Sequence, residues 1–341
     1  MKKSILLIGI ILLTIFITTA CDNKEKESKY DYLVLVNKYS KLPDDWEKNV
    51  ELVTAKNAWD EDVKIEKEAY EQYKKLAKNL KEDGVTIELD SIYRSVKEQQ
   101  ELWDDWSKDP EKGIEYVKKY VATPGYSEHH TGLAIDICLK KDGKLIDDND
   151  DMIAEKEIFK KIHAKLADYG FILRYLDGKD DITGYAYEPW HLRYIGNKEI
   201  AQEIMDKKIT LEEYFESIED IANNKSAAKY HIEKILIDEF EKNIYKDKIS
   251  NERFNVTNIY NQEESNKDET LKSLKLGKDD IAFVVSYELM PKEDANKDEL
   301  MIPDGEYDEE TGWIKDMQRV GILRYNSKNG SFKLENFGTG W

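Results

Sequence analysis

The residue types best suited to metal chemistry stand in two short stretches of the chain, 127–136 and 188–191. The first reads Ser-Glu-His-His-Thr-Gly-Leu-Ala-Ile-Asp, and the second reads Glu-Pro-Trp-His. Zinc in hydrolytic enzymes is held by three protein ligands and keeps one coordination position open. Two imidazoles and one carboxylate would supply these ligands: His129, Asp136 and His191. Glu188 would then act as the base that takes a proton from the attacking water.

The spacing of residues around Asp136 predicts a half-buried strand. Apolar side chains alternate over residues 133–139, so Asp136 lies on the opposite face of the strand. Gly132 lets the backbone turn into this strand, and His129 would fold back toward Asp136 from the preceding loop. A second strand-like run begins at His191. This arrangement differs from the helical H-E-x-x-H motif, in which both histidines share one helix face.

Together, these motifs resemble those of a known enzyme family. The pattern S-x-H-x-x-G-x-A-x-D followed by E-P-W-H resembles the zinc D-Ala-D-Ala carboxypeptidases of the VanY type, which share a fold with the Hedgehog signalling domain. Two further stretches agree with the family: 33–38 with Leu42-Pro43, and 91–95 with Gln99. The resemblance covers about residues 30–215, and the combined motifs are highly specific.

The resemblance implies an α+β catalytic domain with a central, mostly antiparallel sheet flanked by helices. It also implies a zinc-dependent D,D-carboxypeptidase that removes the C-terminal D-alanine from peptidoglycan stem peptides. In that family the arginine that matches Arg94 faces the substrate, and a fixed guanidinium suits a carboxylate or a developing oxyanion. Further candidates for holding the peptide are Ser95, Gln99 and Ser127.

The same metal ligands leave other functions open. Related proteins cut L,D bonds or act as peptidoglycan endopeptidases with the same set of ligands. In a different class, the chain would be a non-catalytic wall-binding lipoprotein, because some proteins of the Hedgehog fold are not peptidases. Glu188 argues against this second class, since binding alone requires no general base.

Three other residues near the motifs have simpler interpretations. His130 would point away from His129 in an extended backbone, so we do not expect it to bind the metal. Cys138 lies about 6–7 Å farther along the strand than the predicted aspartate ligand, and we expect it to be a buried structural thiol. His163 lies among apolar residues of a helix predicted over residues 156–169, so we place it on that helix face.

The first residues have the composition of a bacterial secretion signal, which predicts a signal peptide over residues 1–20. Lys2 and Lys3 precede an apolar core, Ile5–Ile17, that is too short for a comfortable membrane span. Cys21 follows Thr-Thr-Ala, which resembles a lipoprotein cleavage site. It would then carry a lipid that anchors the protein to the cell membrane, facing the cell wall. The alternative is an ordinary secreted protein with an incidental cysteine.

The composition indicates a soluble protein that acts outside the cytoplasm. The 341 residues include 52 Lys and Arg against 71 Asp and Glu, so the formal net charge is −19. Such a charge disfavours nucleic acid as a partner. If Cys21 is lipidated, Cys138 has no partner among the 2 cysteines, and no intrachain disulfide is expected.

The length of the chain favours two domains. A charged tether over residues 21–29 leads into the predicted catalytic domain, 30–220. After a polar hinge, residues 225–341 contain a helix, 230–245, and then strand-like runs, which predicts a small α+β domain of unknown role. These runs are 254–260, 280–289, 321–325 and 331–336.

Within the predicted catalytic domain, an amphipathic helix over residues 66–81 precedes a strand over 85–89 that leads to Arg94. The apolar run 33–36 is expected to form another strand. The acidic run 147–151 lacks the glycine and terminal glutamate of a Ca²⁺ loop, so we expect a solvated loop there.

Overall fold

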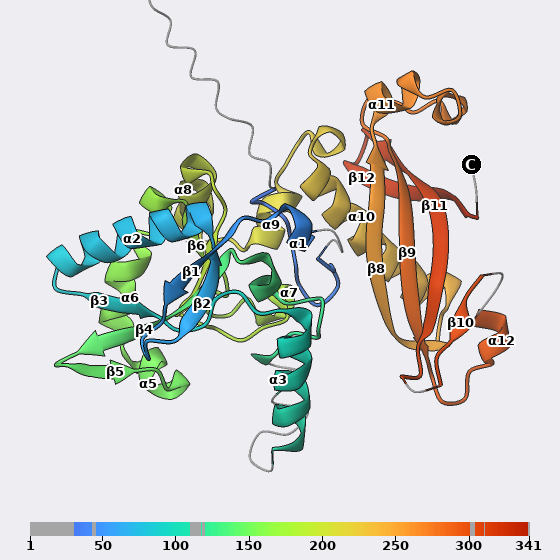
Figure 1. Cartoon of the computed structure of the whole chain (residues 1–341). Coiled ribbons are helices and arrows are strands. Elements are labelled where there is room, and N and C mark those ends of the chain that lie inside the picture. Colours follow the sequence, from blue (N-terminus) through green and yellow to red (C-terminus); the bar gives the residue numbers. More distant parts are fainter. Residues whose placement is uncertain are drawn as a thin grey trace, which may run out of the picture. The chain divides into compact units, whose positions relative to one another are not determined.

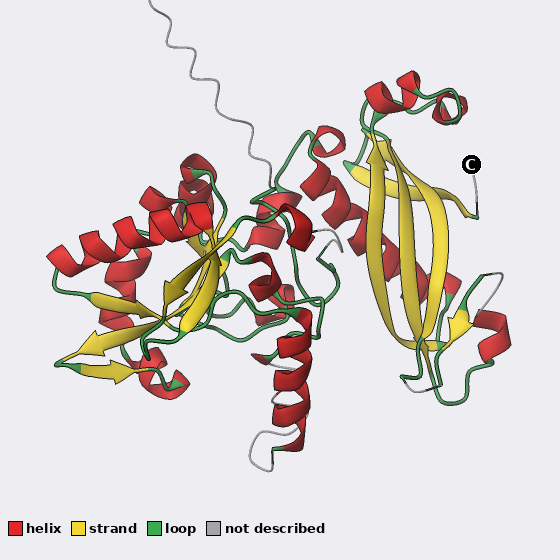
Figure 2. Cartoon of the chain, in the orientation of Figure 1, coloured by secondary structure: helices red, strands yellow, loops and turns green. Residues whose placement is uncertain are grey.

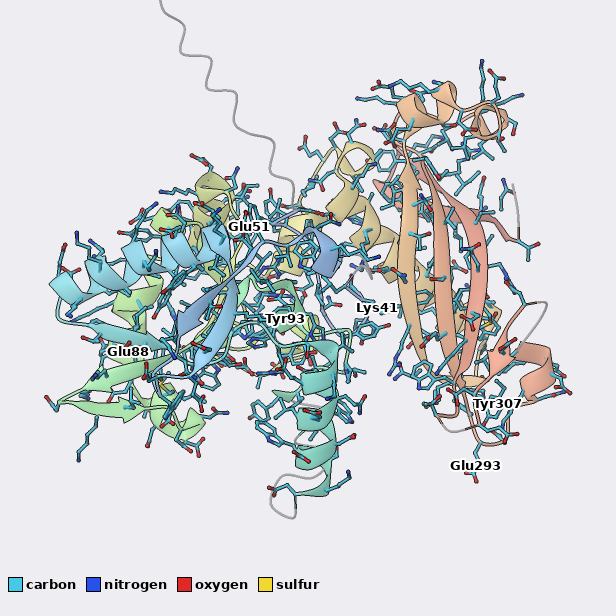
Figure 3. All side chains as sticks on the ribbon, in the orientation of Figure 1. Lys41, Glu51, Glu88, Tyr93, Glu293 and Tyr307 are labelled. Atoms are coloured by element: carbon cyan, nitrogen blue, oxygen red, sulfur yellow. The ribbon has the colours of Figure 1, made fainter. Side chains whose placement is uncertain are left out.

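The computed structural model describes residues 31–42, 46–109, 117, 120–300, 304–309 and 311–339 (Figure 1). The predicted signal peptide, the tether and Cys21 lie outside these residues. The described part consists of helices and antiparallel sheets, so the chain has the predicted α+β class (Figure 2). No helix in these ranges is both long and apolar enough to cross a membrane. Charged side chains such as Glu51 and Glu293 are exposed to solvent (Figure 3).

One antiparallel sheet carries the predicted site. Its strand order is β3-β4-β7-β6, and β5 pairs with β4. The strands are β3 (Thr86–Leu89), β4 (Ala134–Lys141), β5 (Lys144–Ile146), β6 (Phe171–Leu173) and β7 (His191–Tyr194). Because β4 and β7 are neighbours, Asp136 pairs directly with His191 across the ladder. The two motifs therefore meet although they are far apart in sequence.

Helices flank this sheet, as predicted. The predicted amphipathic helix is α2 (Lys67–Glu82). Glu66 caps its N-terminus by accepting a hydrogen bond from the Ala69 amide. One stripe of α2, which includes Leu76 and Leu80, is buried. The other helices of this part are α1 (Trp46–Asn49), α3 (Val96–Lys108), α5 (Asn149–Ala154), α6 (Lys156–His163), α7 (Asp180–Thr183), α8 (Lys198–Lys207) and α9 (Leu211–Glu216).

The run 33–36 is not a strand, contrary to the prediction. The structure assigns no strand to it, and the guanidinium of Arg193 donates hydrogen bonds to the carbonyls of Tyr32 and Val34. A long-range side chain therefore replaces the pairing that the apolar pattern indicated.

Two further local features differ from the prediction. The acidic run 147–151 begins helix α5, because the Asp148 carboxylate accepts hydrogen bonds from the amides of Asp150 and Asp151. Carboxylates are favourable at a helix N-terminus, so an acidic run there supports a helix. A hairpin of β1 (Leu52–Lys56) and β2 (Asp62–Glu66) was not predicted.

The C-terminal part is a helix followed by a sheet, as predicted, but its strands are longer than expected. Helix α10 (Lys225–Glu239) starts earlier than predicted and continues into a π-helical turn, Phe240–Ile244. The strand order is β10-β11-β9-β8, and β12 pairs with β11. The strands are β8 (Ile249–Tyr260), β9 (Ile281–Pro291), β10 (Glu306–Tyr307), β11 (Ile314–Asn326) and β12 (Ser331–Gly338), and the short helices are α11 (Gln262–Lys267) and α12 (Lys297–Leu300).

Helix α10 contributes to two hydrophobic cores. Ile232 and Leu236 pack with the sheet residues of the C-terminal part. Ala227, near the start of the helix, belongs instead to a core with Leu35 and Phe215. The predicted hinge is thus followed at once by a helix that packs against both parts.

Candidate metal centre and peptidase site

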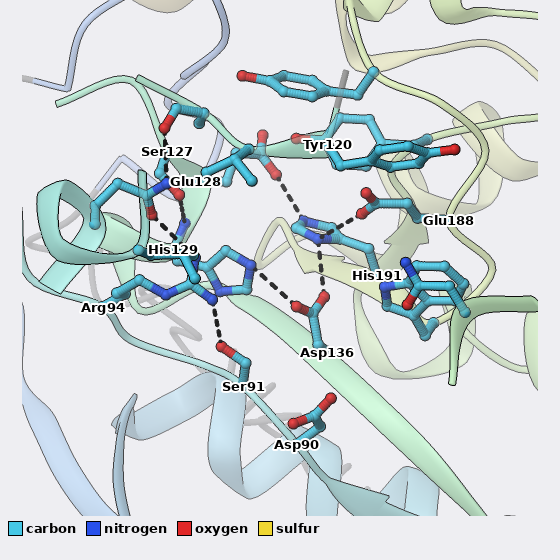
Figure 4. Close-up of a pocket in the computed structure, with 18 of the residues that line it drawn as sticks. Asp90, Ser91, Arg94, Tyr120, Ser127, Glu128, His129, Asp136, Glu188 and His191 are labelled. Carbon is cyan, nitrogen blue, oxygen red and sulfur yellow. Dashed lines mark hydrogen bonds and ion pairs between the residues drawn. The ribbon is translucent and has the colours of Figure 1, made fainter. Parts of the chain in front are cut away.

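The three predicted metal ligands converge in the structure. Nε2 of His129 lies 3.2 Å from Oδ2 of Asp136, and Nδ1 of His191 lies 3.0 Å from Oδ1 of Asp136 (Figure 4). One potential ligand atom from each residue lies within 4.8 Å of the others. Two imidazoles with one carboxylate form a donor set suited to Zn²⁺.

A short 3₁₀ turn, Glu128–Thr131, holds His129 in place. Nδ1 of His129 lies 2.6 Å from the carbonyl oxygen of Ile92 and donates to it, so the lone pair of Nε2 faces Asp136. Gly132 ends the turn at φ +72°, where a Cβ would lie 2.8 Å from Cδ2 of Leu52. The backbone thus requires glycine at this position, as the sequence indicated.

His191 is held from its other side by Glu128. Oε2 of Glu128 lies 3.5 Å from Nε2 of His191. The buried Glu128 also accepts hydrogen bonds of 2.7 Å from both Arg174 and Arg193. Burial alone would raise the pKa of Glu128, but the two guanidinium groups hold it well below its usual range. An ionised Glu128 favours a proton on Nε2 of His191, which leaves Nδ1 free to bind a metal.

The buried polar atoms of this cluster fit a bound cation. Oδ1 of Asp136 accepts no well-aligned hydrogen bond from the described residues, and its nearest polar neighbour is Nδ1 of His191 at 3.0 Å. A buried carboxylate oxygen without a partner is costly, and a metal between Asp136 and the imidazoles would satisfy it. Burial would lower the pKa of His191, but Asp136 and Glu128 raise it to about 10, so the ring attracts a proton where no metal is bound.

Glu188 lies beside the ligands in the position expected of a base. Its Oε2 is 3.6 Å from Nδ1 of His191, and the side chain is buried. Burial raises the pKa of Glu188 and Asp136 raises it further, although His191 lowers it. A carboxylate with a raised pKa accepts a proton more readily than an ordinary one.

The turn that carries Glu188 is fixed by backbone hydrogen bonds. The Glu188 amide donates to the carbonyl of Tyr175 at 3.3 Å, and the His191 amide donates to the carbonyl of Glu188 at 3.2 Å. The Pro189 carbonyl lies 2.9 Å from Nε2 of His163 and accepts a hydrogen bond from it. His163 therefore does more than pack on its helix, a role that its apolar neighbours in sequence did not indicate.

Arg94 follows β3 and is held by two side chains. Its Nη1 donates to Oε1 of Gln99 at 3.0 Å, and its Nη2 donates to Oγ of Ser91 at 2.8 Å. The guanidinium has five N–H donors, so others remain for a substrate. His130 is not a ligand, as expected, because its Nδ1 lies 2.6 Å from the Arg94 carbonyl and its Nε2 accepts from the Gly125 amide.

A cavity of about 230 Å³ opens over these groups. Its volume is below the ~300–1,000 Å³ of sites for drug-sized ligands, which suits a small end group. The five predicted residues Arg94, His129, Asp136, Glu188 and His191 line it, with Gln99 and Ser127. Aromatic side chains also line it: Trp106, Tyr120, Tyr175, Tyr185 and Trp190.

Ser95 does not line this cavity, in contrast to our expectation. Its hydroxyl caps helix α3 in a capping box with Glu98, so it serves the backbone rather than a peptide. The amide of Gln99 is also used by the protein, since Nε2 donates to the Ala122 carbonyl while Oε1 accepts from Arg94. Cys138 is a buried free thiol.

Comparisons with known proteins agree with this geometry. The model of the family named VanY, D-alanyl-D-alanine carboxypeptidase, matches residues 62–197. The bifunctional D-Ala-D-Ala dipeptidase and D-Ala-D-Ala carboxypeptidase VanXYC of Enterococcus gallinarum is 43% identical over 164 residues, which cover 46% of this chain and 79% of that protein. The chain belongs to the D-alanyl-D-alanine carboxypeptidase family.

Another curated protein and a solved structure are also similar to this chain. The putative carboxypeptidase YodJ of Bacillus subtilis is 38% identical over 193 residues, which cover 55% of this chain and 68% of that protein. The structure of the LdcB LD-carboxypeptidase has a TM-score of 0.48 and 36% identity, with 57% of this chain and 89% of that chain covered. Residues 62–197, which match the D-alanyl-D-alanine carboxypeptidase model, contain the three candidate metal ligands, the candidate base Glu188 and Arg94.

Proposed function

We propose that this protein is a zinc-dependent D,D-carboxypeptidase that removes the C-terminal D-alanine from peptidoglycan stem peptides. The observation that carries the proposal is the convergence of His129, Asp136 and His191 beside a buried Glu188. Membership of the D-alanyl-D-alanine carboxypeptidase family supports the choice of substrate.

The residues of the site divide the chemistry among them. A bound Zn²⁺ would supply a Lewis acid that polarises a carbonyl and lowers the pKa of water. Glu188 would take the proton of the attacking water and pass it to the nitrogen of the leaving amine. Arg94, held by Gln99 and Ser91, would bind the terminal carboxylate of the peptide or the developing oxyanion.

Digestion of synthetic stem peptides tests this function. The zinc-loaded protein should convert a pentapeptide ending in D-Ala-D-Ala into a tetrapeptide, with loss of one alanine by mass spectrometry. Cleavage of the tetrapeptide instead would indicate an L,D-carboxypeptidase, and cleavage of cross-linked peptides would indicate an endopeptidase. No turnover of any of them by zinc-loaded protein would favour a wall-binding lipoprotein.

We also propose that the protein is held at the cell membrane, facing the wall, by a lipid on Cys21. The apolar core after Lys2 and Lys3 and the small residues before Cys21 support this location. An anchor of this kind would keep the enzyme near its polymeric substrate.

A further inference from the structure

Asp90 lines the active-site cavity, and the proposed reaction gives it no role. β3 ends at Leu89, which pairs with Ile137 of β4. Beyond this pair, the Asp90 amide donates to the carbonyl of Asp136 at 2.9 Å, and the Asp136 amide donates to the carbonyl of Ser91 at 2.8 Å. Two residues of one strand therefore stand opposite one residue of the other, which is the arrangement of a β-bulge.

The bulge places the Asp90 carboxylate next to the metal site. Opposed residues of antiparallel strands have Cβ atoms roughly 4.5–5.5 Å apart on one face of the sheet, and bulges beside active sites redirect side chains. Asp90, Ser91 and Asp136 all line the same cavity. Figure 4 shows Asp90 directly beside Asp136. A peptide whose scissile bond lies at the metal would thus pass close to Asp90.

Among the residues that the structure describes, none forms a hydrogen bond or ion pair with this carboxylate. The neighbouring Ser91, by contrast, is engaged by Arg94. Burial raises the pKa of Asp90, Asp136 and Asp147 raise it further, and the charge of Arg94 lowers it. A half-buried carboxylate that faces a substrate cavity without a partner favours a cationic ligand. The cavity therefore presents a guanidinium for an anionic group and a carboxylate for a cationic one.

Building on the proposed function, we propose that Asp90 is a specificity residue that binds a primary ammonium group of the peptide substrate. Two sources share this chemistry. One is the α-ammonium of a free D-Ala-D-Ala dipeptide, which is two bonds from the scissile carbonyl carbon. The other is the side-chain ammonium of a diamino residue that precedes D-Ala-D-Ala in a longer peptide. The zinc ligands and Glu188 act on the scissile peptide bond, which all of these substrates have. Asp90 would contact a group that only some of them carry, so it would set the preference among them.

Four soluble peptides in two matched pairs test this role. The first pair is D-Ala-D-Ala and N-acetyl-D-Ala-D-Ala. The second pair is Nα-acetyl-L-Lys-D-Ala-D-Ala and its Nα,Nε-diacetyl form. In each pair only the ammonium is removed. The zinc-loaded wild-type protein is compared with Asp90→Asn, which keeps the shape of the side chain, and with Asp142→Asn. Asp142 is exposed in the turn after β4, so it controls for the loss of one negative charge.

We expect Asp90→Asn to lower kcat/KM by about 10-fold or more for at least one ammonium-bearing peptide, because the hydrogen bond from the ammonium loses its ionised acceptor. The acetylated partner of that peptide should change less than about 2-fold. The pair that shows the difference identifies the source of the ammonium. Asp142→Asn should behave as wild type, and both variants should keep their zinc.

An equal loss of activity toward free and acetylated peptides would overturn the proposal, because Asp90 would then act on the metal site. Unchanged kcat/KM for all four peptides would overturn it as well. The diacetylated peptide has no ammonium, so its turnover by the wild-type protein tests the proposed function separately. If zinc-loaded protein hydrolyses none of the peptides, calorimetric binding of the same pairs tests Asp90, and equal affinity for both members of each pair would contradict it.

Discussion

At the scale of single residues, the site depends on side chains that orient the metal ligands. Glu128 is the clearest of these, because Arg174 and Arg193 keep it ionised beside Nε2 of His191. Its position next to His129 in the sequence gave no indication of this role, since the role requires Arg174, just after β6, and Arg193 on β7.

We expect Glu128→Gln to weaken zinc binding by about 10–100-fold, as is typical when the partner of a ligating histidine is changed. The melting temperature should also fall, because two buried guanidinium groups lose a charged acceptor. Competition with a chelator measures the zinc affinity, and Glu155→Gln, on an exposed ion pair with Lys141, is the control. Unchanged zinc affinity in Glu128→Gln would show that His191 does not need this partner.

At the scale of secondary structure, the sequence predicted the elements whose pattern is local. Alternation and helical periodicity located α2, β3, β4 and β7, and the motif residues on β4, on β7 and in the turn before β4 then gave the candidate ligand set. The pattern did not predict features that depend on distant partners. Arg193 replaces a strand partner for residues 33–36, and the bulge at Asp90 exists only through its pairing with β4.

The contact between α6 and the turn of Glu188 leads to a prediction at the same scale. His163→Ala removes the donor to the Pro189 carbonyl, so the turn and its base should be less well positioned. We expect kcat to fall by about 10–100-fold with little change in KM. His163→Gln retains an N–H donor and should recover part of the loss. If Ala and Gln variants have equal kcat and differ from wild type only in melting temperature, His163 is merely structural.

At the scale of the whole molecule, every residue assigned to the chemistry lies before the predicted domain boundary. A chain that ends at Asp220 should therefore fold, bind zinc and hydrolyse a small soluble peptide. It loses the contact of Ala227 with the core around Phe215 and the hydrogen bond from Lys229 to Ser40. We expect its melting temperature to fall by roughly 5–10 °C. Loss of zinc or of activity would show that the C-terminal part is integral to the catalytic domain.

The proposed location also concerns the molecule as a whole. Mature protein should partition with membranes, and Cys21→Ser should move it to the soluble fraction. A single acyl chain anchors only marginally, so the several chains of a lipoprotein are required. Cell fractionation measures the partitioning, and mass spectrometry of the mature N-terminus measures the modification of Cys21. An unmodified Cys21 in mature wild-type protein would contradict the anchor.

The central claim is that Glu188 acts as the base beside a zinc held by His129, Asp136 and His191. Glu188→Gln preserves the shape of the side chain but cannot accept the proton. Zinc content by elemental analysis and alanine release from a D-Ala-D-Ala peptide, measured on the same samples, test this claim directly. We predict unchanged zinc and KM, with kcat lower by about 10²–10⁴-fold or more. A variant that keeps its kcat, or that loses its zinc, would contradict the role assigned to Glu188.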